Sequence, residues 1–110
     1  MQIAAPPGCE ERARWFFGEV LGLAELEKPP ELARRGGCWF ACGAQQLHVG
    51  VEADFRAAKK AHPALRVKNM IVVKTALNSY KIQFREDEVS PGVKRIFVED
   101  PWGNRLELVE

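Results

Sequence analysis

The segment VEDPWGNRLELVE, residues 98–110, describes the end of one strand, a tight turn and a closing strand. Its proline and its Gly-Asn pair suit the turn, because proline presets φ and Gly-Asn tolerates the positive φ of a chain reversal. Side chains of the closing strand alternate between two faces, so Leu106 and Leu108 share an apolar face and Arg105 and Glu107 share the other. A carboxylate is costly to bury without a partner, and Glu107 is therefore the first candidate for a functional residue.

Length and composition restrict the chain to one small domain with its own core. The 110 residues are 46% hydrophobic, and 16 Lys and Arg against 15 Asp and Glu leave a net charge of +1. No basic stripe suggests nucleic acid, and no apolar run approaches the roughly 20 residues that a membrane helix needs. The N-terminus also lacks the layout of a signal peptide. We expect a cytoplasmic protein with no nucleic-acid or membrane partner.

The three cysteines do not form a recognisable framework. If Cys38 and Cys42 share a strand, they lie about 13 Å apart at ~3.3 Å per residue, which is too far for a disulfide. A zinc site would need a second ligand pair at matching spacing, and the sequence has none. Free thiols in a reducing compartment are the better interpretation.

The first half of the chain predicts one helix and four strands. After Pro6-Pro7-Gly8, apolar residues recur at helical spacing and form one buried stripe, which ends at Gly22. The stripe consists of Ala13, Phe16, Phe17, Val20 and Leu21. The predicted strands are 1–5, 23–28, 38–42 and 45–51, with a polar loop at 31–37 and a hairpin around 43–44.

The second half repeats this pattern. Its β-branched run Ile71-Val72-Val73 locally favours a strand, yet the spacing of the apolar residues in 69–80 also fits a helix. Leu47-His48-Val49 matches Leu106-Glu107-Leu108, so each half reads βαβββ and the ambiguous segment is predicted to be the helix. The predicted strands are 62–67, 81–86, 93–99 and 105–110, with a loop at Ser90-Pro91-Gly92.

The only two histidines fall in predicted strands. Alternation places His48 on the polar face of one strand and His62 on the polar face of another. Together with Glu107 they could point into one hollow, where two imidazoles and a carboxylate can bind a divalent metal. Each also has an ordinary interpretation. His48 would be a hydrogen-bonded sheet histidine, His62 a strand-opening histidine, and Glu107 an exposed carboxylate paired with Arg105.

Four segments resemble the vicinal oxygen chelate superfamily, which includes glyoxalase I, bleomycin-resistance proteins, fosfomycin-resistance thiol transferases and extradiol dioxygenases. The run RWFFGEVLGL at 14–23 is similar to its "FYxxxLGL" helix. The others are QLHVG at 46–50, HPAL at 62–65 and DPWGNRLEL at 100–108. The resemblance covers nearly the whole chain and is specific for the fold, although it does not specify the reaction.

The resemblance implies an α+β fold in which paired βαβββ units form a cupped mixed sheet with helices on the convex face. A single glyoxalase/bleomycin-resistance/dioxygenase-like domain would span 1–110, with one unit at about 1–51, a connector at 52–61 and a second unit at 62–110. It also implies a homodimer in which the cups are completed across the two copies.

The resemblance further implies metal ligands on the first and last strands of each unit. His62 matches the first-strand ligand of the second unit, Glu107 its last-strand ligand, and His48 the last-strand position of the first unit. The remaining histidine of the family pattern would fall just before Met1, so either the site lacks that ligand or the true start lies upstream. Gln2, on the same strand face as the missing side chain, is a candidate weak ligand or substrate contact.

The function implied is a divalent-metal-dependent enzyme of lyase, isomerase or dioxygenase type, acting on a small oxygen-chelating substrate. Nickel, manganese, iron and zinc all suit such ligands, and Glu107 could dissociate to act as the catalytic base. Arg66 either receives an anionic substrate or is a solvated sheet residue, and Phe97 either lines the hollow or fills the core. The alternative is a metal-free small-molecule binding protein of the bleomycin-resistance type, which the missing histidine favours.

Overall fold

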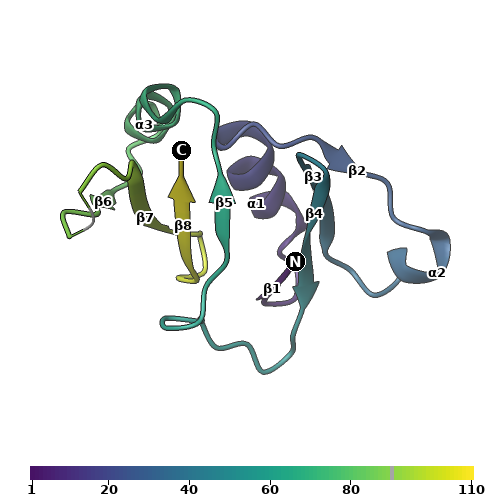
Figure 1. The fold of residues 1–110 in the computed structure, drawn as a ribbon. Coiled ribbons are helices and arrows are strands. Elements are labelled where there is room, and N and C mark those ends of the chain that lie inside the picture. The colour runs from purple at the N-terminus through teal and green to yellow at the C-terminus, as the bar shows by residue number, and fades with distance from the viewer. Residues whose placement is uncertain (90) are drawn as a thin grey trace. The chain divides into compact units, whose positions relative to one another are not determined.

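A computed structural model describes residues 1–89 and 91–110 of the chain (Figure 1). Ser90, in the loop predicted at 90–92, lies outside the described residues. The chain forms two compact units, which we call unit one (Met1–Ala57) and unit two (Ala58–Glu110). Their boundary lies inside the stretch 52–61 that was expected to connect the halves. Each unit carries its own mixed four-stranded sheet, and the described residues form a few helices, so the predicted α+β class is confirmed.

Unit one contains a sheet in the order β1-β4-β3-β2, in which β1 is parallel to β4 and the other pairs are antiparallel. The predicted hairpin is confirmed with its bounds. The strand expected at 23–28 is only two residues long, and the loop expected at 31–37 begins with a short helix, which Pro30 starts at its first position. The elements are β1 (Gln2–Ala5), α1 (Glu10–Ala13), η1 (Arg14–Val20), β2 (Glu25–Leu26), α2 (Pro30–Ala33), β3 (Cys38–Cys42) and β4 (Gln45–Val51).

The helix of unit one begins as α1 and continues as the π-helix η1, whose wider turn is seen in the Leu21 N–H bond to the Phe16 carbonyl at 3.0 Å. The predicted stripe is buried except for Leu21, which is partly exposed, and it packs against β3, where the Phe17 ring centre lies 5.7 Å from that of Phe40. Gly22 ends the helix with a positive φ of 79°, as expected for a glycine cap.

Glu10 links the start of this helix to Gly37, the residue just before β3, through a hydrogen bond. Its Oε2 accepts a hydrogen bond of 2.7 Å from the Gly37 N–H, and this bond holds the pKa of Glu10 below its ordinary value. Gly37 has a φ of 86°, and a Cβ there would lie 2.1 Å from the Val49 carbonyl oxygen. Only glycine fits this close approach.

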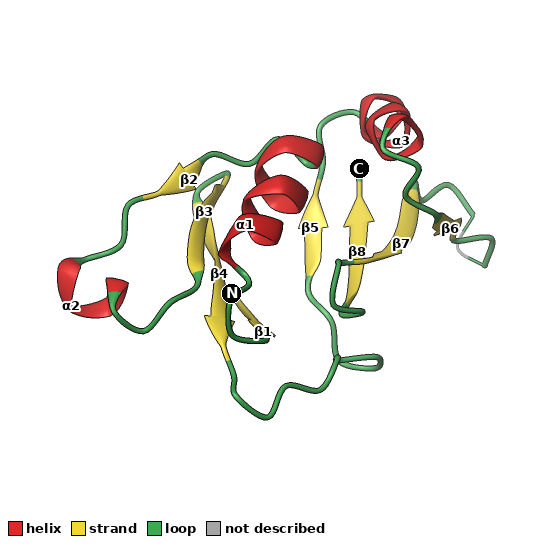
Figure 2. Cartoon of the chain, turned by 180° about the vertical axis from the view of Figure 1, so that it is seen from behind, coloured by secondary structure: helices red, strands yellow, loops and turns green. Residues whose placement is uncertain are grey.

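Unit two repeats the topology with the sheet order β5-β8-β7-β6, again with its first and last strands parallel (Figure 2). All four strands are shorter than predicted. Strand β5 begins at Ala64 rather than His62, and β6 begins only after Lys81, which has a positive φ. Strand β7 begins two residues later than predicted, and β8 ends one residue earlier. The elements are β5 (Ala64–Arg66), α3 (Met70–Ser79), β6 (Phe84–Glu86), β7 (Arg95–Glu99) and β8 (Arg105–Val109).

The helix α3 forms despite its β-branched run, as the internal repeat predicts. The Asn69 side chain caps it by accepting from the N–H groups of Ile71 and Val72 at 3.0 and 3.3 Å. Met70 and Leu77 are buried, while Ile71 and Val72 are exposed. Burial of the helical stripe therefore overrides local β propensity. Among the described residues, no helix combines the length and apolar character that crossing a bilayer requires.

The cysteines are free thiols, two of them buried. Burial is the main cause that raises the pKa of Cys9 to about 11, with the Glu10 carboxylate adding to it. Cys38 also has a raised pKa because of burial. These thiols therefore pack as small apolar side chains.

We predict that Glu10→Gln lowers the free energy of unfolding at pH 7 by about 1.5 kcal/mol, because the bond to Gly37 loses its charge. The lowered pKa of Glu10 means that this contribution is present above its ordinary value of 4.5 and is lost as the pH falls through the folded-state pKa. The difference between wild type and variant should therefore shrink below pH 4.5. Urea unfolding as a function of pH measures it, with the exposed Glu11→Gln as control; equal curves for both variants would contradict the assignment.

Candidate functional site

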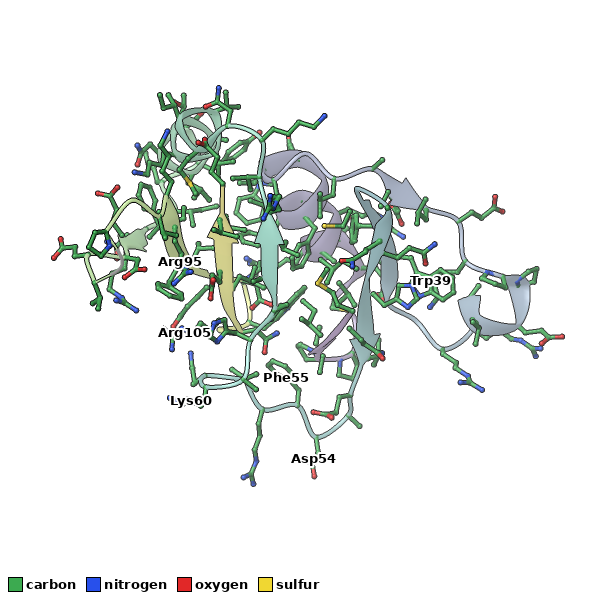
Figure 3. All side chains as sticks on the ribbon, viewed as in Figure 1. Trp39, Asp54, Phe55, Lys60, Arg95 and Arg105 are labelled. Atoms are coloured by element: carbon green, nitrogen blue, oxygen red, sulfur yellow. The ribbon has the colours of Figure 1, made fainter. Side chains whose placement is uncertain are left out.

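The partly exposed face of the unit-two sheet carries the candidate site. The alternation predicted for β8 is confirmed, because Leu106 and Leu108 are buried and the residues between them are not. Glu107 lies opposite Phe97 of β7 on one side and Ala64 of β5 on the other. Arg95 is on the same face of β7 as Phe97 and reaches toward β8 (Figure 3).

His62 lies just before β5 and contacts Glu107. Its Nε2 is 3.1 Å from Glu107 Oε1, and its Nδ1 is 2.8 Å from the Lys60 carbonyl oxygen. A carbonyl oxygen only accepts hydrogen bonds, so Nδ1 carries a proton. Nε2, which faces the carboxylate, then either carries a second proton, as in an imidazolium, or presents a lone pair. A lone pair directed at a carboxylate oxygen is a ligand arrangement, with the backbone carbonyl fixing the tautomer.

The other oxygen of Glu107 is held by Arg95. Arg95 Nε lies 3.0 Å from Glu107 Oε2, within ion-pair distance, although the N–H is not aligned for a hydrogen bond. Nη1 of the same guanidinium donates to Asp87 Oδ2 at 3.2 Å. Glu107 thus lies between His62 and Arg95 and does not pair with Arg105.

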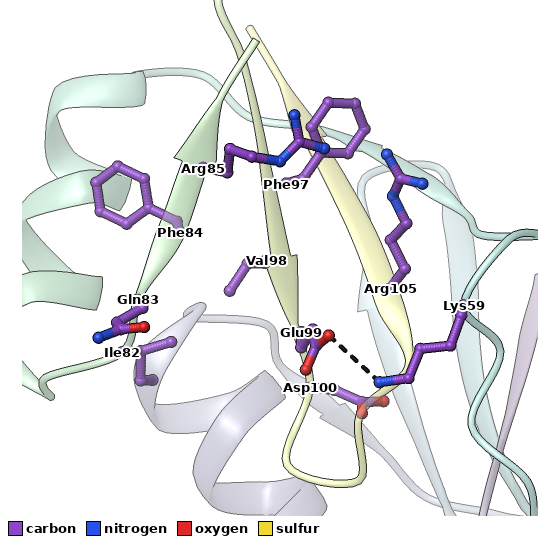
Figure 4. A pocket seen from close by; sticks show the side chains of 10 residues that line it. All are labelled: Lys59, Ile82, Gln83, Phe84, Arg85, Phe97, Val98, Glu99, Asp100 and Arg105. Atoms are coloured by element: carbon purple, nitrogen blue, oxygen red, sulfur yellow. Dashed lines mark hydrogen bonds and ion pairs between the residues drawn. The ribbon is translucent and has the colours of Figure 1, made fainter.

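Phe97 forms the apolar centre of this face. The Cζ atoms of Arg85 and Arg105 lie 4.9 and 4.5 Å from its ring centre, and the His62 ring meets its edge at 5.9 Å (Figure 4). The ring lines an open cavity of about 790 Å³. His62 and Glu107 do not line this cavity, so a position of Phe97 in the hollow predicted for those residues stays a prediction.

The turn before β8 is a rigid support for these side chains. Asp100 and Asn104 are only 4% and 3% exposed. Asp100 Oδ1 accepts from the N–H groups of Trp102 and Asn104, and Oδ2 accepts from Asn104 Nδ2 at 2.8 Å. Asn104 Oδ1 in turn accepts from the Ala58 N–H at 2.9 Å. Burial raises the pKa of Asp100 despite these hydrogen bonds.

In unit one, His48 lies on the partly exposed face of β4. Its ring stacks on Trp39 with centres 4.0 Å apart and an angle of 2°, and Nε2 lies 2.9 Å from Gln46 Oε1. Burial, followed by the positive charges of the N-terminus and Lys28, lowers the pKa of His48. Gln2 lies opposite His48 on β1, and both line a cavity of about 330 Å³.

The structure thus brings together part of the predicted set. His62 and Glu107 meet in unit two, whereas His48 and Gln2 lie side by side in unit one. Among the described residues, no group of three His, Cys, Asp or Glu side chains is close enough to hold a metal. Arg66 is exposed on β5. Convergence of His48, His62 and Glu107 stays a prediction.

Sequence reasoning placed Arg105 on this face with Glu107 but missed Arg85 and Arg95 as members of it. The signal was present in β7, where alternation places Arg95 beside Phe97. The pairing of β6 with β7, which puts Arg85 opposite Phe97, had no signal in the sequence.

The chain is 50% identical to a glyoxalase family protein from Bacillus anthracis, whose crystal structure it matches with a TM-score of 0.96 over 99% of this chain and 89% of that one. A lactoylglutathione lyase from Agrobacterium tumefaciens shares the fold at 23% identity and a TM-score of 0.71, over 100% and 91% of the two chains. An antibiotic binding protein from Streptomyces sp. CB03234 shares the fold at 18% identity and a TM-score of 0.71, over 98% of this chain and 91% of that one.

No family model and no curated protein sequence matches the chain. The likeness to the Bacillus anthracis protein is nevertheless enough to assign the family, because half of the residues are identical over almost the full length of this chain. The chain belongs to the glyoxalase family, and its neighbours agree with the vicinal oxygen chelate superfamily that its motifs resemble.

We predict that Asn104→Ala lowers the free energy of unfolding by about 2–3 kcal/mol, because it leaves the buried Asp100 carboxylate and the Ala58 N–H short of partners. Asn78→Ala, at an exposed position of α3, should change it by less than about 0.5 kcal/mol. Denaturant unfolding of both variants tests this. A loss no larger in Asn104→Ala than in Asn78→Ala would mean that the turn does not depend on this side chain.

Proposed function

We propose that the chain is a divalent-metal-dependent enzyme of the glyoxalase superfamily, of lyase, isomerase or dioxygenase type, that acts on a small oxygen-chelating substrate. The observation that carries the proposal is the pair in unit two, with His62 Nε2 3.1 Å from Glu107 Oε1. We also expect a cytoplasmic homodimer, as the resemblance implies.

The donor chemistry of this pair fits a metal. The Lys60 carbonyl holds the His62 proton on Nδ1, which leaves Nε2 free to bind a cation. The Glu107 carboxylate supplies a negative oxygen beside it. His62 and Glu107 would hold the metal, and histidine with carboxylate suits nickel, manganese, iron or zinc.

A bound divalent metal would supply Lewis-acid polarisation of a substrate oxygen. The residues of the chain would perform the other tasks. Arg95 keeps the Glu107 carboxylate oriented through Oε2, since its Nε lies 3.0 Å from that oxygen. Glu107 Oε1 is then the proposed acceptor for a substrate proton, because it faces the same side of the sheet as the Phe97 ring.

The second candidate function is metal-free binding of a small molecule. The stacked pair Trp39 and His48 favours it, because two parallel rings 4.0 Å apart on a partly exposed sheet offer an outer aromatic face on which a planar ligand could stack. The antibiotic binding protein from Streptomyces has the same fold. In this case His62 would be an imidazolium paired with Glu107.

Metal analysis separates the two functions. Protein incubated with nickel, manganese, iron(II) or zinc and then desalted should retain about one equivalent of one of these metals. His62→Ala and Glu107→Ala should each weaken that binding by at least ~10-fold, since each removes a ligand, while Glu52→Ala, at an exposed position of unit one, should not. Protein that stays metal-free with all four metals would instead be the binding protein.

A further inference from the structure

Two guanidinium groups meet at one aromatic ring in unit two. Arg85 on β6 lies directly opposite Phe97 in the strand register, and Arg105 lies on β8, on the other side of β7. Their Cζ atoms are 4.9 and 4.5 Å from the Phe97 ring centre, so they are no farther apart than the sum of these distances. Figure 4 shows both side chains reaching toward the ring from the flanking strands.

The neighbouring carboxylates are already committed to other groups. Glu99 pairs with Lys59 at 3.3 Å, and Glu107 pairs with His62 and Arg95. Asp100 is used within its turn, and Glu86 pairs with Lys74. In the part of the chain that the structure describes, no carboxylate forms an ion pair or hydrogen bond with Arg85 or Arg105.

Among the described side chains no carboxylate neutralises either cation, and a cation–π contact at an exposed site contributes only about 0.5–1 kcal/mol. An oxyanion that reaches both groups would supply the negative charge and accept forked hydrogen bonds, because guanidinium geometry matches a carboxylate or a phosphoryl group. Both arginines are mounted on strands, so little ordering is needed for this contact.

The surroundings leave room for such a ligand. Arg85, Phe97 and Arg105 all line the open cavity of about 790 Å³, together with Lys59. The His62 ring, at 5.9 Å from that of Phe97, places the proposed metal pair beside the same surface. A ligand anchored at the arginines would thus extend toward His62 and Glu107.

We infer that Arg85 and Arg105 form an oxyanion-binding subsite over Phe97 that receives the carboxylate or phosphoryl group of a small ligand. The inference deepens the proposed function and rests on it for the role of that ligand as substrate. It makes the substrate class a small acid that carries an oxyanion in addition to its chelating oxygens. The binding step itself needs no metal.

The test uses protein freed of metal with EDTA and dialysed. Sodium malonate and inorganic phosphate are titrated separately at constant ionic strength against sodium chloride, and backbone and arginine Nε–H signals are followed by NMR. At least one of the two anions should give saturable shifts at 84–86, 96–98 and 104–106. The anion that binds more tightly assigns the group as carboxylate or phosphoryl.

The double variant R85Q/R105Q should bind that anion at least ~10-fold more weakly, while the control R56Q, which removes the same charge from an exposed position, should stay within about twofold. If the double variant does not fold, R85Q and R105Q alone should each weaken binding at least ~3-fold. Equal affinities in wild type, the arginine variants and R56Q would overturn the inference, as would the absence of saturation by either anion.

This result is independent of the metal test. H62A should retain anion binding within about twofold, because the arginines lie on other strands. Protein that binds the anion but no metal keeps the subsite and loses the metal-dependent function. Protein that binds metal but no anion keeps the metal-dependent function and loses the subsite.

Discussion

Both units depend on one constraint, the parallel pairing of their first and last strands. This pairing places Gln2 opposite His48 in unit one and Ala64 opposite Glu107 in unit two. In unit two it also brings His62 within 3.1 Å of a carboxylate 45 positions later in the chain. Hairpins alone join only neighbours in sequence, so groups from the two ends of a unit meet only because of the crossover through its helix.

The fold was predictable wherever the hydrophobic pattern extended over enough residues to distinguish a helix from a strand. The hairpin of β3 and β4, the closing strand β8 and the first helix all follow from local patterns, and α3 followed from the internal repeat. Strand β2 could not be bounded, because its two residues are a strand only through their pairing with Phe40 and Trp39. The π-helical turn of η1 also has no local signal, since it serves the packing of Phe16 and Phe17.

The candidate site was predictable for the residues that belong to motifs, and less so for their neighbours. His62 and Glu107 were predicted, with His48, to share one hollow, and these two do lie together in unit two. Pairing of Glu107 with Arg105 was the alternative interpretation, yet Arg95 on the adjacent strand is the actual partner. Arg95 lies opposite Val109 and is therefore a diagonal neighbour of Glu107, within reach of a long side chain, and the sequence does not reveal the strand register that places it there.

The segment before β5 is joined to β8 by main-chain bonds, from the Arg105 N–H to the Ala58 carbonyl and from the Glu107 N–H to the Pro63 carbonyl. His62 is thereby registered on the same ladder that buries Leu106 and Leu108. A slip of one residue in β8 would turn the leucines outward and remove Glu107 from the imidazole in a single event. The contact between His62 and Glu107 and the hydrophobic interior are therefore inherited together, and selection for either one preserves the other.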